Sequence, residues 1–442
     1  MFKFVYLALS ITGVCACATQ AQTPLSELPA TPNRAYVNGL WYNGNRFDPR
    51  TGYVVGGTLT FEKPRQVSET IDLRGGFVVP PLADAHCHHF DTASMAQTLV
   101  PQYLREGVFY AQSLGNGAVA RRKPSVRAFF DVPNGIDVSY ADASLTATLG
   151  HPFLIYESLA NGFYADMDSA QNRERVRTLR KGEGETYFFV ETPPMLNRAW
   201  PQIKRRPPDV LKIMLLESDR YEEKRKKAEP GDNGLPPEIV PEIVKRAHRS
   251  GLRVFAHVEN AYDFKVAVDA GVDGFAHLPG YSMNDSPAQA YVLDEKTVRA
   301  FGKRGGVITP TASLAPFYTV SKTPGTLERV QGVQKRNLQM LRKYGVQIAV
   351  GSDNYGQGPW GEAEYLRNSG IFTDRELLRM WCESSRTIFP KRKIGHLAEG
   401  YEASFLVIDA DPSQDIRRLK QIRLRVKQGV ILSLPPDSPG KP

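Results

Sequence analysis

Hydrophobic and polar positions change their spacing repeatedly between residues 76 and 353. Short apolar runs are typical of buried strands, and apolar positions three or four apart are typical of helices. Good helices are predicted at 236–250 and 261–270. The pattern predicts eight strands. The first ends at His86 to His88, and the others span residues 107–114, 137–143, 209–216, 253–257, 273–278, 306–311 and 346–352. Alternating strands and helices over this length predict an α/β fold, a (β/α)8 TIM-like barrel spanning 81–393.

The segments before and after this region have a different sequence pattern. Short apolar runs separated by Asn-Gly and Gly-Gly turns fill residues 35–80, and short strands return at 394–434. We expect these flanks to pair as a small β-sandwich domain built from both chain ends. Thr373 and Glu376 are spaced as a capping box, which predicts a helix at 373–388.

The segment 151–206 is longer than a barrel connection needs. Loops that follow the strands form the active-site face of such barrels. Two interpretations stay open for this insertion, a lid over that face and a plain surface excursion.

The N-terminus is typical of an exported protein. Lys3 precedes an eleven-residue apolar run, 4–14, and Ala16-Cys17-Ala18 follows, which predicts a signal peptide at 1–21. The tetrad ending at Cys17 loosely resembles a lipobox, so a lipid anchor at Cys17 is an alternative to cleavage. A linker at 22–34 and a loose proline-rich tail at 435–442 complete the division of the chain. We expect a periplasmic protein, an outer-membrane lipoprotein or a secreted one, because no later segment is apolar enough to span a bilayer.

The amino-acid composition limits the classes of binding partner that we expect. The chain has 442 residues, with 41% hydrophobic and 23% charged side chains, which is typical of a globular protein. Its net charge of +9 is scattered, and its basic clusters have no interleaved aromatic residues, so we expect no nucleic-acid partner. A small-molecule substrate is the expected partner, and homo-oligomerisation stays open. Outside the signal, Cys87 and Cys382 are far apart and form no disulfide framework.

Candidate metal ligands occur in or near the ends of the predicted strands. His86 and His88 point to one face of an extended strand, because side chains alternate with a period of two. All eight strand ends of a parallel barrel meet at one mouth, so distant residues converge there. One histidine at a strand end is usually structural, but this whole set predicts a metal centre. Its members are His86, His88, Lys212, His257, His277 and Asp353.

Lys212 is unusual because it lies within the apolar run Val210 to Leu215. Burial disfavours an ammonium and lowers the pKa of a lysine. A neutral amine can react with carbon dioxide to form a carbamate, whose two oxygens could bridge two metal ions. The alternative is a lysine ion-paired inside the barrel with Asp353. The four histidines favour the carbamate.

These motifs together resemble the amidohydrolase superfamily of metal-dependent hydrolases, from about residue 35 to 432. The resemblance is strongest to prolidase-like dipeptidases and imidazolonepropionase-related proteins. Two departures are Pro80-Pro81, where the family usually has Pro-Gly, and Ala403-Ser404, where Ala-Asp is common. The matching pieces are Val79 to His88, Leu211 to Ile213, Ala256-His257, Gly274 to His277, Gly351 to Asp353 and Ile394 to Gly400.

The resemblance implies a binuclear site that hydrolyses a C–N bond in an amide, cyclic amide or dipeptide. His86, His88 and Asp353 would hold one divalent ion, His257 and His277 the other, and carboxylated Lys212 would bridge them. Histidine and carboxylate ligands suit zinc. Asp353 would orient a metal-activated water and pass its proton to the leaving nitrogen.

Other expectations concern substrate contacts and alternatives. His151, Tyr110 and Tyr281 are candidate substrate contacts. A mononuclear deaminase-like enzyme would instead use Glu259 as a proton shuttle, and Lys212 argues against it. A non-catalytic envelope binding lipoprotein on the same fold is the alternative from another class.

Overall fold

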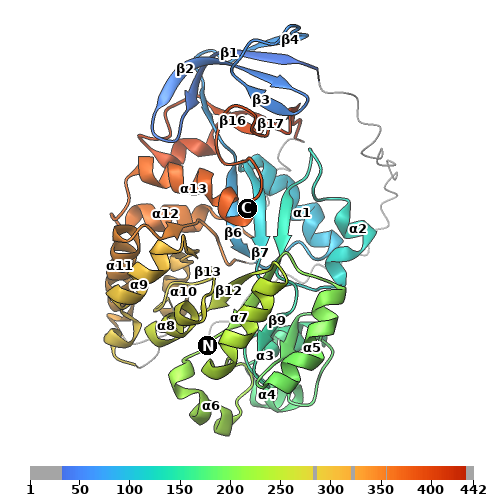
Figure 1. Ribbon diagram of the computed structural model, residues 1–442, viewed down its shortest axis with the longest axis vertical. Coiled ribbons are helices and arrows are strands. Elements are labelled where there is room, and N and C mark those ends of the chain that lie inside the picture. The colour runs from blue at the N-terminus through green and yellow to red at the C-terminus, as the bar shows by residue number, and fades with distance from the viewer. Residues whose placement is uncertain (1–31, 282–285, 320–323, 355, 435–442) are drawn as a thin grey trace.

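Figure 1 shows the computed structural model, which describes residues 32–281, 286–319, 324–354 and 356–434. The expected signal peptide, the Cys17 anchor, residues 22–31 of the linker and the tail lie outside the described residues. Within these ranges, no helix is both long and apolar enough to pass through a bilayer.

The middle of the chain forms two parallel sheets, as the alternating pattern predicts. One has the order β6-β7-β8 and the other the order β10-β9-β11-β12-β13-β14-β15. The strands are β6 Leu82–Cys87, β7 Val108–Ser113, β8 Asp137–Tyr140, β9 Ser144–Thr146, β10 Tyr187–Phe189, β11 Val210–Met214, β12 Arg253–His257, β13 Gly274–Phe275, β14 Val307–Ile308 and β15 Gln347–Ile348. Most of these strands are shorter than the apolar runs that predicted them. The sequence pattern did not predict β9 and β10 as separate strands.

Backbone hydrogen bonds join both edges of the three-stranded sheet, β6 and β8, to the seven-stranded sheet. At one edge the amide of Ala85 in β6 donates to the carbonyl of Val350, just beyond β15, at 2.9 Å. At the other, the amide of Asp209, just before β11, donates to Tyr140 in β8 at 2.8 Å. The first and last strands of the α/β region are therefore neighbours, and residues near 86 and 353 come together.

Helices lie around these sheets (Figure 1). The predicted capping box is confirmed: Thr373 caps α13 and Glu376 completes the box. Trp381 of α13 donates its indole N–H to the carbonyl of Ala83 in β6 at 2.9 Å, which anchors this helix behind the strand that ends in the histidines. The helices are α1 Ala93–Arg105, α2 Pro124–Arg127, α3 Phe153–Ala160, α4 Ala170–Val176, α5 Pro193–Arg205, α6 Tyr221–Lys227, α7 Val240–Arg249, α8 Ala261–Ala270, α9 Glu295–Lys303, α10 Ala315–Thr319, α11 Thr326–Lys343, α12 Trp360–Asn368 and α13 Asp374–Ile388.

Both flanks of the chain contribute to one mixed eight-stranded sheet at one end of the molecule, at the top of Figure 1. Its path is β18-β17-β16-β5-β1-β2-β3, and β4 also pairs with β1. The antiparallel pairing of β16 with β5, for example Leu406 with Val79, joins the two flanks. The strands are β1 Arg34–Tyr42, β2 Phe47–Val55, β3 Thr58–Thr60, β4 Glu69–Asp72, β5 Phe77–Val79, β16 Phe405–Ile408, β17 Ile422–Lys427 and β18 Val430–Ile431.

A buried ion pair ties this mixed sheet to the parallel strands. Lys427 at the end of β17 is fully buried and lies 2.6 Å from a carboxylate oxygen of Asp137, the first residue of β8. The same ammonium donates to the carbonyls of Val132 and Gly135. Arg392 contacts the second carboxylate oxygen of Asp137 at 2.8 Å.

We predict that Lys427→Met lowers the free energy of unfolding by about 3–5 kcal/mol, because it leaves a buried carboxylate and two carbonyls short of a partner. Urea unfolding followed by circular dichroism measures this. The matched control is Lys227→Met, which removes an exposed, solvent-screened pair with Glu223 and should leave the free energy of unfolding almost unchanged. Equal losses of unfolding free energy in the two variants would contradict the role of Lys427 in joining the mixed sheet to the parallel strands.

Candidate metal centre

Two backbone carbonyls set the orientation of the first two histidines. The Nδ1 of His86 lies 2.8 Å from the carbonyl oxygen of Ala276, and the Nδ1 of His88 lies 3.1 Å from that of Gly115. A carbonyl only accepts hydrogen bonds, so Nδ1 carries the proton and Nε2 carries a lone pair in each neutral ring. The two Nε2 atoms then face each other at 3.1 Å.

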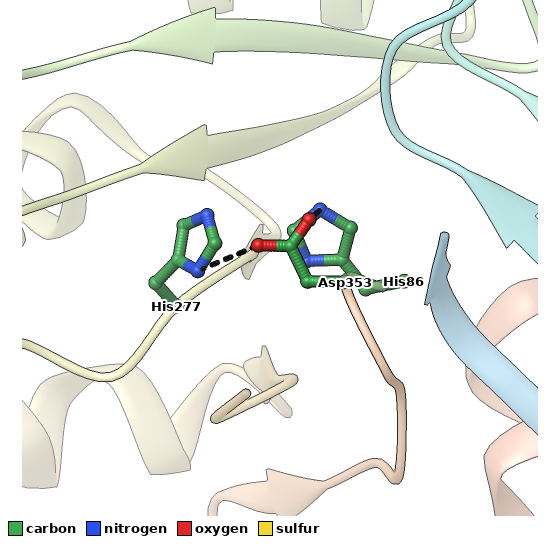
Figure 2. A group of neighbouring side chains, drawn as sticks. All are labelled: His86, His277 and Asp353. Atoms are coloured by element: carbon green, nitrogen blue, oxygen red, sulfur yellow. Dashed lines mark ion pairs between the residues drawn. The ribbon is translucent and has the colours of Figure 1, made fainter. Parts of the chain in front are cut away.

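Asp353 completes this cluster from beyond β15. Its backbone N–H donates to the carbonyl of His86 at 2.7 Å, and its φ of 49° is in the left-handed region. One carboxylate oxygen lies 3.3 Å from the Nε2 of His86 and 3.0 Å from that of His88. The other lies 3.8 Å from the Nδ1 of His277, so the carboxylate sits between two imidazoles in Figure 2. Burial would raise the pKa of Asp353, but the neighbouring histidines and Lys212 hold it well below its usual range.

This donor set fits a divalent metal ion. Three electron-pair donors, the two Nε2 atoms and the carboxylate oxygen, lie 3.0–3.3 Å from one another. Such donors repel unless a proton or a cation lies among them. Tetrahedral zinc with bonds of about 2.0–2.1 Å places its ligand atoms roughly 3.3 Å apart, which matches this spacing.

The other two histidines lie against this cluster. The His277 ring centroid is 4.9 Å from that of His86 and 4.4 Å from that of His257. The Nδ1 of His277 lies 2.7 Å from the hydroxyl of Thr311, whereas the Nε2 of His257 lies 3.0 Å from a carboxylate oxygen of Glu259. Ligand atoms of His86, His277 and Asp353 all lie within 4.8 Å of one another.

Lys212 in β11 is 1% exposed. The described residues hold no carboxylate within 4.0 Å of its ammonium, so the direct ion pair with Asp353 that the sequence left open does not form. Burial lowers the pKa of Lys212 to about 7, although the charge of Asp353 opposes this. A substantial fraction of this amine is therefore neutral at neutral pH, as carbamate formation requires.

Asp84 is a buried residue of the site that the sequence reasoning missed. Its carboxylate accepts hydrogen bonds from the backbone amides of His86 (3.1 Å) and Ser352 (3.0 Å) and from the hydroxyls of Ser352 and Tyr103, both at 2.8 Å. Burial raises the pKa of Asp84 to about 6, and these donors oppose the shift. Its position two residues before His86, on the same face of the strand, was the signal that could have found it.

A cavity of about 690 Å³ is lined by four of the candidate ligands, His88, His257, His277 and Asp353. The insertion 151–206 lines part of it through residues between His151 and Asp168, so it contributes to the mouth. His151 lies with its ring centroid 4.8 Å from that of His257, and Tyr281 stacks on His277 at 4.6 Å. These two candidate substrate contacts line the cavity.

Tyr110 corrects a sequence-based expectation. It is fully buried in β7, and its hydroxyl donates to Glu402 at 2.9 Å, next to the mixed sheet. The cavity lining does not include it. Tyr110 is paired with Asp137, the first residue of β8, and so lies toward the end of the strands that is opposite the mouth; its role is structural.

Comparisons with known proteins agree with this geometry. No family model matches the chain. Ochratoxinase of Aspergillus niger is 25% identical over 191 residues, which are 41% of this chain and 37% of that protein. Imidazolonepropionase of Hahella chejuensis is 23% identical over 357 residues, 78% of this chain and 81% of that protein. The chain is thus similar in sequence to both of these proteins, and to the second over most of its length.

Solved structures show the amidohydrolase fold over nearly the whole chain. The crystal structure of A. niger ochratoxinase superposes with a TM-score of 0.70 at 18% identity, covering 92% of this chain and 97% of that one. A Xaa-Pro dipeptidase superposes with a TM-score of 0.66 at 18% identity, covering 90% and 99%. The sequence match to ochratoxinase spans little more than a third of that protein (37%), whereas the fold match is almost complete.

We predict that His88→Ala lowers the metal content of the purified protein by at least one ion per chain, because it removes one of three converging donors. Elemental analysis of protein prepared without chelator measures this. The control is His248→Ala, whose partly exposed ring pairs only with Asp273 at the surface. Unchanged metal content in His88→Ala would exclude this ligand.

Proposed function

We propose that the chain is a metal-dependent amidohydrolase that cleaves a C–N bond with a binuclear centre at the mouth of an eight-stranded barrel. The observation that carries this proposal is the approach of His86, His88 and Asp353 to 3.0–3.3 Å, with buried Lys212 in the same cavity lining. His86, His88 and Asp353 would hold one ion and His257 and His277 the other, with zinc the best-suited metal.

Bound divalent metal would supply a Lewis acid that activates water and polarises the scissile carbonyl. Asp353 would orient that water and accept its proton, then donate it to the leaving nitrogen. The hydrogen bonds of His86, His88 and His277 through Nδ1 keep their rings in place. His257 would have to exchange its contact with Glu259 to act as a ligand.

Lys212 would bridge the two ions as a carbamate. Its burial, the lowering of its pKa to about 7 and its place in the cavity lining support this role. Together with burial, the charge of Lys212 contributes to lowering the pKa of His86 and that of His277, one from each proposed histidine pair.

The names of the relatives indicate the substrate class. Ochratoxinase, imidazolonepropionase and a Xaa-Pro dipeptidase are among the proteins to which this chain is similar. We infer from them an amide, cyclic amide or dipeptide as substrate. The signal peptide predicted from the sequence supports action outside the cytoplasm, in the periplasm, at the outer membrane or in the medium.

A mononuclear, deaminase-like enzyme is the second candidate. The ligand atoms of three residues, His86, His277 and Asp353, all lie within 4.8 Å of one another, and three ligands are enough for one ion. Glu259 lies against His257, where a proton shuttle would be placed. The metal stoichiometry separates the two candidates, and absence of metal uptake would instead favour a non-catalytic binding protein.

We predict that Asp353→Asn lowers kcat about 10²- to 10⁴-fold while metal remains bound, because the amide cannot accept the proton. A panel of dipeptides, acylated amino acids and cyclic amides, tested with metal-loaded protein, measures turnover. The control is Asp409→Asn, which alters an exposed pair with Arg423. Full activity in Asp353→Asn would defeat the proposed role.

We also predict two metal ions per chain when the protein is supplied with zinc and bicarbonate, and fewer in Lys212→Ala, which cannot form the bridge. Elemental analysis gives the stoichiometry. Carbon-13 NMR after reconstitution with labelled bicarbonate should show a carbamate signal in the parent protein that Lys212→Ala lacks. One ion per chain, unaffected by Lys212→Ala, would favour the mononuclear enzyme.

A further inference from the structure

Aromatic rings from two separate parts of the chain line the cavity. Tyr156 and Tyr164 come from the insertion, and Phe317 and Tyr318 come from α10. Tyr318 packs edge-on against Tyr281 with ring centroids 5.6 Å apart, and Tyr281 in turn stacks on His277. Aromatic surface therefore runs from the metal centre to the mouth.

Two of these rings face solvent. Phe317 is 52% and Tyr318 is 42% exposed, although both follow the buried residue Ala315 in one short helix. Large exposed aromatic side chains beside a cavity mark a surface that a ligand covers. The cavity volume of about 690 Å³ lies within the range of about 300–1,000 Å³ that holds a ligand of substantial size.

The charged side chains of the lining have a clear bias. Asp166, Asp168 and Asp353 line the cavity, and Lys212 is the one cationic side chain among the described lining residues. The bias runs against the composition of the chain, which has 56 lysines and arginines and 47 acidic residues. Lys212 and Asp353 lie at the metal centre, so the charges at the mouth are carboxylates.

The two mouth carboxylates have different partners. Asp168 pairs with Arg173 at 2.9 Å, but 73% of its side chain is exposed, which weakens that pair. Asp166 accepts a hydrogen bond from the neutral amide of Asn172 at 3.1 Å and has no ion pair among the described residues. Its negative charge is therefore available at the rim.

We propose that the cavity selects substrates with a cationic group on an apolar stem, such as the side chain of a lysine residue. This inference rests on the proposed function and names the substrate class of the same site. The stem would lie along the rings, and the ammonium would meet the ring faces and the Asp166 carboxylate. A cation over an aromatic face gains about 0.5–2 kcal/mol, which corresponds to roughly two- to thirtyfold in affinity.

A matched panel isolates the side-chain charge. Gly-X and X-Gly dipeptides with X as lysine, norleucine or glutamate keep both termini constant, and norleucine has the lysine stem without the ammonium. With metal-loaded protein, the lysine compound should have a kcat/KM at least about fivefold above norleucine in one orientation, and glutamate should be the poorest. Higher salt should reduce the preference for lysine.

Binding to the same protein by calorimetry gives a readout that does not need turnover. No turnover of any compound, with the lysine compound still bound most tightly, would defeat dipeptide hydrolysis but support the cavity inference. Turnover or binding without preference for lysine over norleucine would overturn the inference.

Substitutions at the cavity lining test which residues cause the preference for lysine over norleucine. Asp166→Asn should raise the KM of the lysine compound more than that of norleucine, so that the ratio between them falls, and Tyr318→Leu should lower the ratio as well. The control Glu174→Gln neutralises a carboxylate that is 79% exposed on α4, outside the cavity lining, and should leave the ratio unchanged. An unchanged ratio in both Asp166→Asn and Tyr318→Leu would overturn the inference.

Discussion

The site depends on the junction between β6 and the segment that follows β15. Asp84 accepts hydrogen bonds from both sides of this junction, and the Asp353 amide bonds to the His86 carbonyl. These contacts bring residues some 270 positions apart into one cluster. Each of them uses a buried polar group, and a buried polar group is costly without a partner. The fold therefore favours the register in which His86, His88 and Asp353 meet.

Backbone geometry at the strand ends shows the same constraint. Several residues other than glycine adopt left-handed φ just beyond the parallel strands, at a cost of order 1–3 kcal/mol each. Thr311 (φ 48°) and Asp353 (φ 49°) are two of them. Thr311 contacts the Nδ1 of His277, and Asp353 is itself a candidate ligand. The left-handed turns aim these side chains into the mouth, where ordinary strand continuation would not.

The opposite end of the parallel strands has a purely structural network. Asp137, Lys427 and Arg392 form a buried cluster there, and Tyr110 bonds to Glu402 nearby. Ionisable groups thus gather at both ends of the same strands. At the mouth they converge with lone pairs facing one another, whereas near the mixed sheet they pair with opposite charges. This contrast separates a site that needs a cation from one that is already neutralised.

The sequence by itself determined the alternating architecture and the residue types of the candidate metal centre. Apolar runs identified the parallel strands because buried strands tolerate few polar residues, and the exceptions His86, Lys212 and His257 stood out for that reason. Tertiary structure alone decided which polar residues share the mouth. It placed Tyr110 against Glu402, brought Asp84 into the junction and set the insertion beside α10 in the cavity lining, because these relations depend on strand register and on contacts across hundreds of residues. The order of hydrophobic and polar residues along the chain contains no information on strand register or on such long-range contacts.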